Sequence, residues 1–225
     1  MRPNHLKMPS TWKEAKVALL DRVLFIPPRC QHFKDFVFPG WEHPDIFGNS
    51  NPVNLEYCSG NGAWIAEKAL QYPEQNWVAV EKKFERVRKI WSKIKNHQLN
   101  NLLVVCGEGF AATRNYFPDN SIDETFINFP DPWPKTRHAK NRIMRPVFTA
   151  EVARILKKEG SLMFVTDDVP YSEWTIEVLQ QNNSFACVYK NPYYLTENEN
   201  YGSSSFHKLW REQGRIIRYH RFKRL

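Results

Sequence analysis

One short segment of the chain combines a carboxylate, a large aromatic ring and several cations. It reads Phe129-Pro130-Asp131-Pro132-Trp133-Pro134-Lys135-Thr136-Arg137-His138. Three prolines in five positions exclude a helix and a central strand, so we predict a rigid loop. An acid beside a stacking ring suits the binding of a flat, hydrogen-bonding base, and the cations behind it suit the attached phosphates. Taken alone, a proline-rich surface loop with solvated charges is the alternative.

Three further acids follow successive predicted strands. Glu56 opens the turn Glu56-Tyr57-Cys58-Ser59-Gly60-Asn61-Gly62, in which Gly60 and Gly62 allow a ligand to approach the backbone at a helix N-terminus. Glu81 ends the next strand, where the acid of dinucleotide-binding folds accepts hydrogen bonds from ribose hydroxyls. Glu108 follows the third strand.

These three carboxylates argue against a pyrophosphate-bearing cofactor such as NAD, and the first glycine of the dinucleotide fingerprint is missing. They suit a cofactor that has no phosphate and carries an amine and a positive sulfonium. S-adenosylmethionine is such a cofactor. The alternative for each position is an ordinary acid at a strand end.

The elements that must position these residues alternate between strand and helix from residue 53 onward. This alternation predicts stacked βαβ units, and therefore an α/β fold with a mostly parallel sheet and helices on both faces. The tail from Phe185 has no helical period until Ser204 and is expected to add antiparallel edge strands. The expected strands are 53–56, 77–80, 102–105, 122–129 and 162–165, and the expected helices are 63–71, 84–94, 148–156 and 171–181.

The first 50 residues carry mixed signals. Trp12 to Leu24 reads as a short helix, and we expect residues 1–50 to form an N-terminal extension packed on the core. Residues 51–225 are expected to form the catalytic domain.

Charge and composition restrict the partners. The 225 residues carry a net charge of +8, which implies an anionic partner, and nucleic acid is the first candidate. No apolar run reaches the length of a membrane span, so no membrane association is expected. The scattered cysteines indicate neither a metal site nor a disulfide framework and suit a reducing cytoplasm. We expect a monomer or a homodimer.

With these residues in view, the chain resembles the bacterial-type tRNA (guanine-N7-)-methyltransferase family from about Leu55 to Phe222. The segment from Phe129 to His138, continued by Lys140, Asn141 and Arg142, is the most specific part. Glu81 in Val-Glu-Lys-Lys and the sequence Val165-Thr166-Asp167 support it. The resemblance implies a Rossmann-like methyltransferase fold and methylation of guanosine N7 at position 46 of the tRNA variable loop.

The resemblance also implies roles for individual residues. Asp131 is the expected catalytic residue. The expected cofactor-binding residues are Glu56, Gly60, Gly62, Glu81, Glu108 and Asp131. Substrate contacts are expected from Lys135, Asp167, Ser204, Phe206 and His207, and RNA contacts from Arg137, His138, Lys140, Asn141 and Arg142.

Two positions depart from the family pattern. The turn position that is usually glycine is Cys58, and the family's C-terminal Thr-x-Phe-Glu element reads Ser204-Ser205-Phe206-His207. A neutral His207 does not replace a carboxylate, so either the local register or the contact to the base differs here.

Guanine N7 has a free lone pair and needs no deprotonation before it attacks a methyl sulfonium. No general base is therefore required. Asp131 and Asp167 are the candidates for accepting hydrogen bonds from the guanine edge. Trp133 is expected either to stack on the base or to pack in the core. Two alternatives stay open: a methyltransferase for an exocyclic amine of RNA or DNA, and a non-catalytic RNA-binding protein with a decayed cofactor site.

Overall fold

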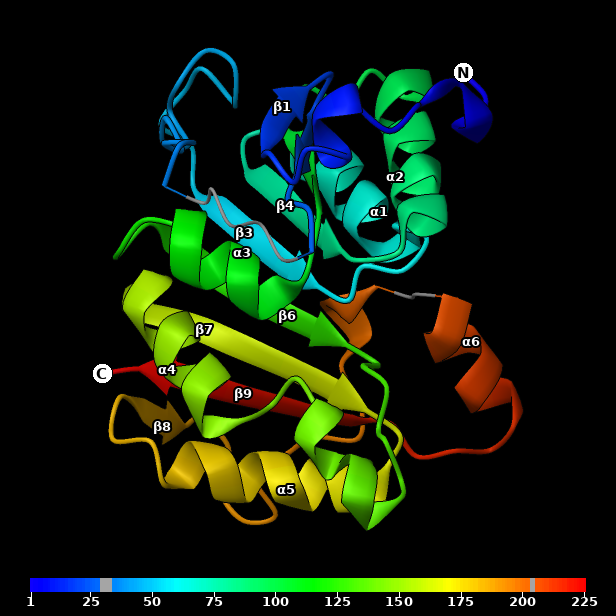
Figure 1. Cartoon of the computed structure of the whole chain (residues 1–225). Helices are drawn as coiled ribbons and strands as arrows, with labels where there is room; N and C mark the ends of the chain where they lie inside the picture. Colours follow the sequence, from blue (N-terminus) through cyan, green and yellow to red (C-terminus); the bar gives the residue numbers. More distant parts are fainter. Residues whose placement is uncertain (29–33, 203–204) are drawn as a thin grey trace. The chain divides into compact units, whose positions relative to one another are not determined.

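The computed structural model describes residues 1–28, 34–202 and 205–225, and the chain divides into two compact units (Figure 1). Unit 1 comprises Met1–Pro118 and unit 2 comprises Asp119–Leu225. Each unit contributes strands and helices of its own. Within the described residues, no helix has the length and apolar character needed to cross a membrane.

Unit 1 has five strands in the order β1-β2-β5-β4-β3. Strands β2, β5, β4 and β3 run parallel, and β1 is antiparallel to β2. The strands are β1 (Ala18–Leu20), β2 (Val23–Phe25), β3 (Val53–Tyr57), β4 (Asn76–Glu81) and β5 (Leu102–Cys106). The helices are α1 (Ala63–Gln71), α2 (Phe84–Asn96) and α3 (Gly109–Tyr116), with short 3-10 turns at Pro3–His5 and Ser10–Trp12.

Helices cover both faces of the unit 1 strands, as the sequence predicts. Every residue of β3, β4 and β5 is buried, which is typical of parallel strands enclosed on two sides. On one face, Trp64 of α1 packs against Trp77 of β4 with ring centroids 6.0 Å apart. Tyr57 of β3 pairs with Val80 of β4, and Val80 is three residues from Trp77, so Tyr57 lies on the other face of the sheet. There the Tyr57 hydroxyl forms a hydrogen bond with Thr113 of α3.

The predicted helix from Trp12 to Leu24 is wrong. The chain instead forms the β1–β2 hairpin, whose two turn residues, Asp21 and Arg22, have φ of +50° and +66°. Positive φ at both central residues is the geometry of a tight two-residue hairpin. Pairing of β2 with β5 buries Val23, Leu24 and Phe25 completely, and this non-local burial outweighs the local helical pattern.

Unit 2 has four strands in the order β6-β7-β9-β8. Strands β6 and β7 are parallel, whereas β9 is antiparallel to both β7 and β8, so the predicted antiparallel edge is confirmed. The strands are β6 (Ile122–Asn128), β7 (Leu156–Thr166), β8 (Phe185–Cys187) and β9 (Arg218–Arg224). The helices are α4 (Pro146–Ile155), α5 (Val169–Gln180) and α6 (Ser205–Glu212), with 3-10 turns at Thr136–Asn141 and Glu199–Tyr201.

A buried histidine joins α5 to β9 in unit 2. His220 is fully buried, and its ring stacks on Phe222. Its Nδ1 lies 3.2 Å from the carbonyl oxygen of Tyr193, which can only accept, so Nδ1 carries the proton. Its Nε2 accepts from Ser172 Oγ at 3.0 Å. Burial, the largest effect, lowers the pKa of His220 to about 4.

We expect acid to destabilise the protein through His220. Its folded-state pKa of about 4 lies below the ordinary value of 6.5, so this stability is complete above pH 6.5 and is lost as the pH falls towards 4. The expected loss between pH 7.5 and pH 5 is about 2 kcal/mol, measured by urea unfolding. His220→Asn, which cannot titrate, should lack this component, and an identical pH dependence in both proteins would contradict the assignment.

Candidate active site

In unit 1, the turn after β3 contains three residues in the left-handed region. Cys58, Gly60 and Gly62 have φ of +59°, +55° and +68°. The turn is closed by two hydrogen bonds to Ser59: its Oγ donates to the Glu56 carbonyl at 2.9 Å, and its carbonyl accepts from Gly62 N–H at 2.8 Å. The sequence therefore places small residues where the backbone reverses sharply before α1.

The left-handed geometry at Cys58 explains why glycine is favoured there. We expect Cys58→Gly to stabilise the protein by about 0.5–1 kcal/mol, because relief of a strain of about 1–2 kcal/mol exceeds the extra entropy cost of glycine. Urea unfolding measures the difference. Cys187→Gly in β8 is the control and should destabilise, since a glycine without a side chain weakens a strand. A loss of stability in Cys58→Gly would contradict the strain argument.

The carboxylate of Glu81 is buried at the end of β4 and fixes the turn. It accepts from the backbone N–H of Gly60 at 3.0 Å and from that of Lys83 at 2.8 Å, and Arg86 lies 3.6 Å away. The side chain is 4% exposed. Since each carboxylate oxygen has two acceptor positions, these bonds leave capacity for a ligand hydroxyl.

The other two acids of unit 1 differ in environment. Glu56, at the fourth position of β3, is 2% exposed. Glu108 is exposed and caps α3, its Oε2 accepting from Ala111 N–H at 2.8 Å. Burial first, and then the charge of Glu81, raise the pKa of the Cys106 thiol to about 12, so this buried thiol stays protonated.

In unit 2, the proline-rich loop follows β6; its residues 129–135 are neither helix nor strand, as predicted, and the 3-10 turn begins at Thr136. Phe129 and Trp133, at its two ends, both have φ of +47°, although neither is glycine. Backbone of this kind costs about 1–3 kcal/mol per residue and persists only where the surroundings enforce it. Between them, Asp131 is exposed, and Lys135 beyond them is exposed as well.

The two acids after β7 have separate roles. Asp168 caps α5 by accepting from Tyr171 N–H at 2.8 Å, which is a structural role. Asp167 is paired with Arg215, whose Nη1 lies 2.5 Å from its Oδ2. The Asp167 side chain is 11% exposed and that of Arg215 is 49% exposed, so a half-exposed cation covers this carboxylate.

The C-terminal element is described only in part. Ser204 and the side chain of Phe206 lie outside the described residues. His207, in α6, lies edge-on to Phe129 with ring centroids 6.4 Å apart, and its Nε2 is 2.6 Å from Tyr219 Oη. Burial first, then Arg211, lower the pKa of His207, so the ring is neutral at pH 7. His207 thus contacts Phe129 at the start of the loop as a neutral ring.

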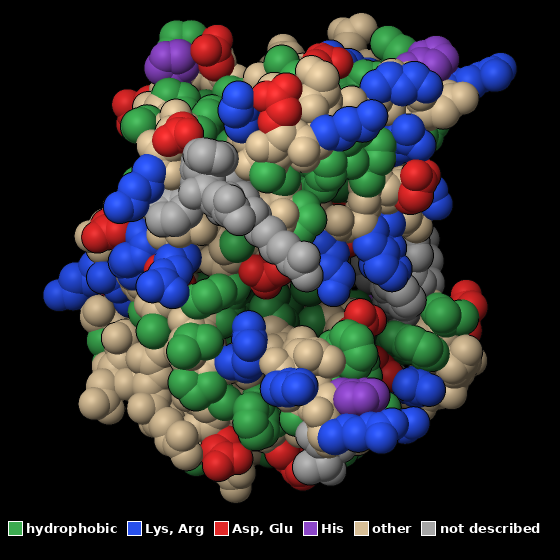
Figure 2. All heavy atoms as spheres, in the orientation of Figure 1, with side chains coloured by type: hydrophobic (Ala, Val, Ile, Leu, Met, Phe, Trp, Pro, Cys, Tyr) green, Lys and Arg blue, Asp and Glu red, His purple; other side chains and the backbone are tan. Residues whose placement is uncertain are grey.

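The residues expected to contact RNA differ in their exposure. Arg137, Lys140 and Asn141 are exposed, and Figure 2 shows Lys and Arg side chains distributed over the visible face of the molecule. His138 is half-buried against Trp133, with ring centroids 5.9 Å apart. Arg142 is buried at 8% exposure.

Residues 50–219 match the model of a protein family described as "Putative methyltransferase". The tRNA (guanine-N(7)-)-methyltransferase of Chlamydia caviae is 42% identical over 99% of this chain and 97% of its own length. The enzyme of the same name from Chlamydia muridarum is 43% identical over 96% of this chain and 95% of its own. The chain belongs to the tRNA (guanine-N(7)-)-methyltransferase family. The predicted family resemblance is thereby confirmed.

Solved structures agree with the fold of this tRNA (guanine-N(7)-)-methyltransferase family member. The 16S rRNA methyltransferase KamB has a TM-score of 0.58 at 15% identity, covering 79% of this chain and 90% of that one. An rRNA methylase from Streptococcus thermophilus has a TM-score of 0.52 at 12% identity, covering 79% and 89%. The predicted Rossmann-like methyltransferase fold is confirmed.

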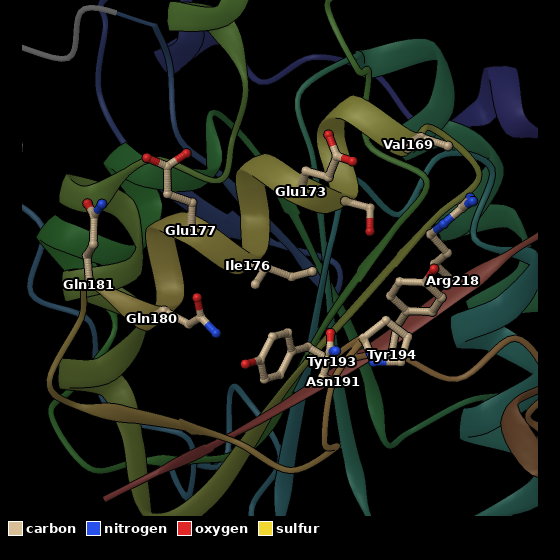
Figure 3. A pocket seen from close by; sticks show the side chains of 12 residues that line it. Val169, Glu173, Ile176, Glu177, Gln180, Gln181, Asn191, Tyr193, Tyr194 and Arg218 are labelled. Atoms are coloured by element: carbon tan, nitrogen blue, oxygen red, sulfur yellow. The ribbon is translucent and has the colours of Figure 1, made fainter.

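A groove elsewhere in unit 2 lies apart from these residues. It has a volume of about 480 Å³ and lies between α5 and residues 191–194. Figure 3 shows Ile176 and Gln180 of α5 directed towards Tyr193 across it. Among the described residues, none of those expected to bind cofactor, substrate or RNA lines this groove.

Sequence reasoning missed several supporting residues. Tyr201 donates from Oη to Asn128 Oδ1 at 2.5 Å, next to the start of the loop. Tyr171 and Trp174 of α5 hold the segment that follows the loop through its backbone. The spacing of Tyr171 and Trp174, one helical turn apart, was a usable signal, whereas Tyr201 carried none.

Proposed function

We propose that this protein transfers a methyl group from S-adenosylmethionine to N7 of a guanosine in tRNA, at position 46 of the variable loop. The observation that carries the proposal is the match over nearly the whole chain to tRNA (guanine-N(7)-)-methyltransferases at 42–43% identity. Methyltransferases of this kind use S-adenosylmethionine in general.

The cofactor would bind at the carboxyl ends of β3, β4 and β5. The residues present fit it: the left-handed turn from Cys58 to Gly62 brings backbone to the surface, and buried Glu81 retains acceptor capacity for ribose hydroxyls. Glu56 and Glu108 add negative charge, which suits an amine and a sulfonium. When bound, S-adenosylmethionine supplies an electrophilic methyl group.

Unit 2 supplies the groups that act on the guanine. The N7 lone pair needs no base, so the task is orientation, which is worth up to about 7–11 kcal/mol in well-aligned cases. Asp131, exposed between two prolines, would accept hydrogen bonds from the guanine edge and stabilise the charge that develops on the ring. Lys135 and Asp167 would contact the nucleoside, Asp167 after displacement of Arg215.

The net charge of +8 supports binding of a polyanion. Arg137 and Lys140, exposed beyond the loop, would contact phosphates, and tRNA binding should then weaken steeply as the salt concentration rises. His138 and Asn141 are proposed to assist at the same surface.

The product identifies the reaction. Purified protein is incubated with labelled S-adenosylmethionine and tRNA transcripts that have or lack a variable-loop guanosine, and borohydride with aniline then cleaves RNA at 7-methylguanosine. We expect cleavage at that guanosine alone. Methyl transfer without cleavage would indicate an exocyclic-amine methyltransferase, and tRNA binding without transfer a non-catalytic RNA-binding protein.

A further inference from the structure

Arg142 occupies an unusual position for a cation in an RNA-binding segment. It is 8% exposed, whereas its neighbours Lys140 and Asn141 are exposed. Its Nε donates to the carbonyl oxygen of Pro132 at 2.9 Å. Its guanidinium lies over two ring faces, 5.0 Å from the centroid of Tyr171 and 5.5 Å from that of Trp174.

The two rings also fix the backbone that follows Arg142. Tyr171 Oη accepts from Ile143 N–H at 3.1 Å and from Met144 N–H at 3.3 Å. Trp174 Nε1 donates to the Met144 carbonyl at 2.5 Å. Because α5 is capped by Asp168 and packs on β7 through Tyr171 and Phe164, 5.1 Å apart, it forms a rigid support under residues 142–144.

The loop needs an external hydrogen-bond donor. Pro130, Pro132 and Pro134 have no N–H, so the loop has few backbone donors with which to hold its own shape. The Pro132 carbonyl belongs to the peptide between Pro132 and Trp133, and Trp133 has a left-handed φ of +47°. The bond from Arg142 therefore acts where the strained backbone most needs support.

We propose that Arg142 is a positioning residue, which fixes the Pro132 carbonyl and thereby the direction of the adjacent Asp131 carboxylate. This inference rests on the proposed function of Asp131. It assigns Arg142 a role other than the phosphate contact expected from the sequence. Lysine cannot substitute, since it lacks both the planar face that stacks on two rings and the fixed Nε–H.

Steady-state kinetics of the full chain separate positioning from phosphate binding. We expect Arg142→Lys and Arg142→Met each to lower kcat by about 10- to 100-fold, because small misplacements of reacting groups have effects of this size. Both should keep the wild-type dependence of tRNA affinity on salt. Lys140→Ala, on the same segment, should instead reduce that salt slope by about one. Lys158→Met is the control, because Lys158 is exposed near the start of β7, and it should change neither kcat nor the salt slope.

An activity-independent readout accompanies the kinetics. Amide exchange at Asp131, Trp133 and Lys135, followed by NMR, should accelerate in both Arg142 variants and not in Lys140→Ala. If the variants unfold, Trp174→Phe retains Arg142 but removes the bond to Met144, and should lower kcat with an unchanged salt slope.

Two results would overturn the proposal. A reduced salt slope with wild-type kcat in Arg142→Met would make Arg142 a phosphate ligand. A wild-type kcat and wild-type amide exchange in every variant would show that Arg142 has no role in the loop. A wild-type protein without activity would instead refute the proposed function, and faster exchange would then still support the positioning role.

Discussion

Asp131→Asn is expected to lower the kcat for methyl transfer by about 10²- to 10³-fold, the size seen when one group that stabilises developing charge is removed. The change keeps the size of the side chain and removes its charge. Since Asp131 is exposed, the urea midpoint should stay close to that of the wild type. Single-turnover measurement with saturating cofactor and tRNA isolates the chemical step.

Asp123→Asn is the matched control. Asp123 lies near the opposite end of β6 and pairs with Lys157 at 2.9 Å, so it should affect kcat little. Cofactor affinity, measured separately by equilibrium dialysis, shows whether Asp131 also contacts S-adenosylmethionine. Unchanged kcat in Asp131→Asn would remove Asp131 from the reaction and leave Asp167 as the remaining candidate.

Gly62→Ala is expected to destabilise the protein by about 2–5 kcal/mol. A Cβ at this position would lie 2.6 Å from Ile90 Cγ1 of α2, closer than real contacts allow. Overpacking costs about 1–3 kcal/mol, and the left-handed φ of +68° adds about 1–2 kcal/mol for a residue with a Cβ. Urea unfolding monitored by tryptophan fluorescence gives the free energy.

Gly60→Ala separates the two contributions. Gly60 has a similar φ of +55°, but the nearest atom to an added Cβ is 3.9 Å away. Only the backbone strain should remain, at about 1–2 kcal/mol. The double variant Gly62→Ala/Ile90→Ala should then lose less free energy of unfolding than the sum of the losses in the two single variants. Equal losses in Gly60→Ala and Gly62→Ala, with additive behaviour, would contradict the close packing against α2.

The regular part of the fold was predictable because its signals are local. β5 is a continuous apolar run and β4 contains one at 77–80, α2 has a strong helical period, and parallel strands bring the acids at their ends to one edge. The proline-rich loop was predictable for the same reason, since proline acts on its own backbone. Family resemblance then supplied the reaction.

The parts of the fold and of the site that could not be predicted depend on contacts between residues distant in sequence. The β1–β2 hairpin forms because β2 is buried against β5. Helix α3, which has only eight residues, was not predicted. Arg142 looked like one more cation in a basic cluster, and only its contacts with Tyr171 and Trp174 reveal that it points inward. Burial of a charge on an aromatic surface leaves no local pattern.

The pairing of β2 with β5 has a consequence for synthesis on the ribosome. Val23 pairs with Val104, so the hairpin must wait for roughly 80 further residues to be made before its partner strand exists. At about 5–20 residues per second, that interval is on the order of 4–16 s. During it, the apolar edge of β2 is unpaired and open to other nascent chains. Slow translation between residues 25 and 106 would therefore prolong a period in which protection by chaperones decides the yield.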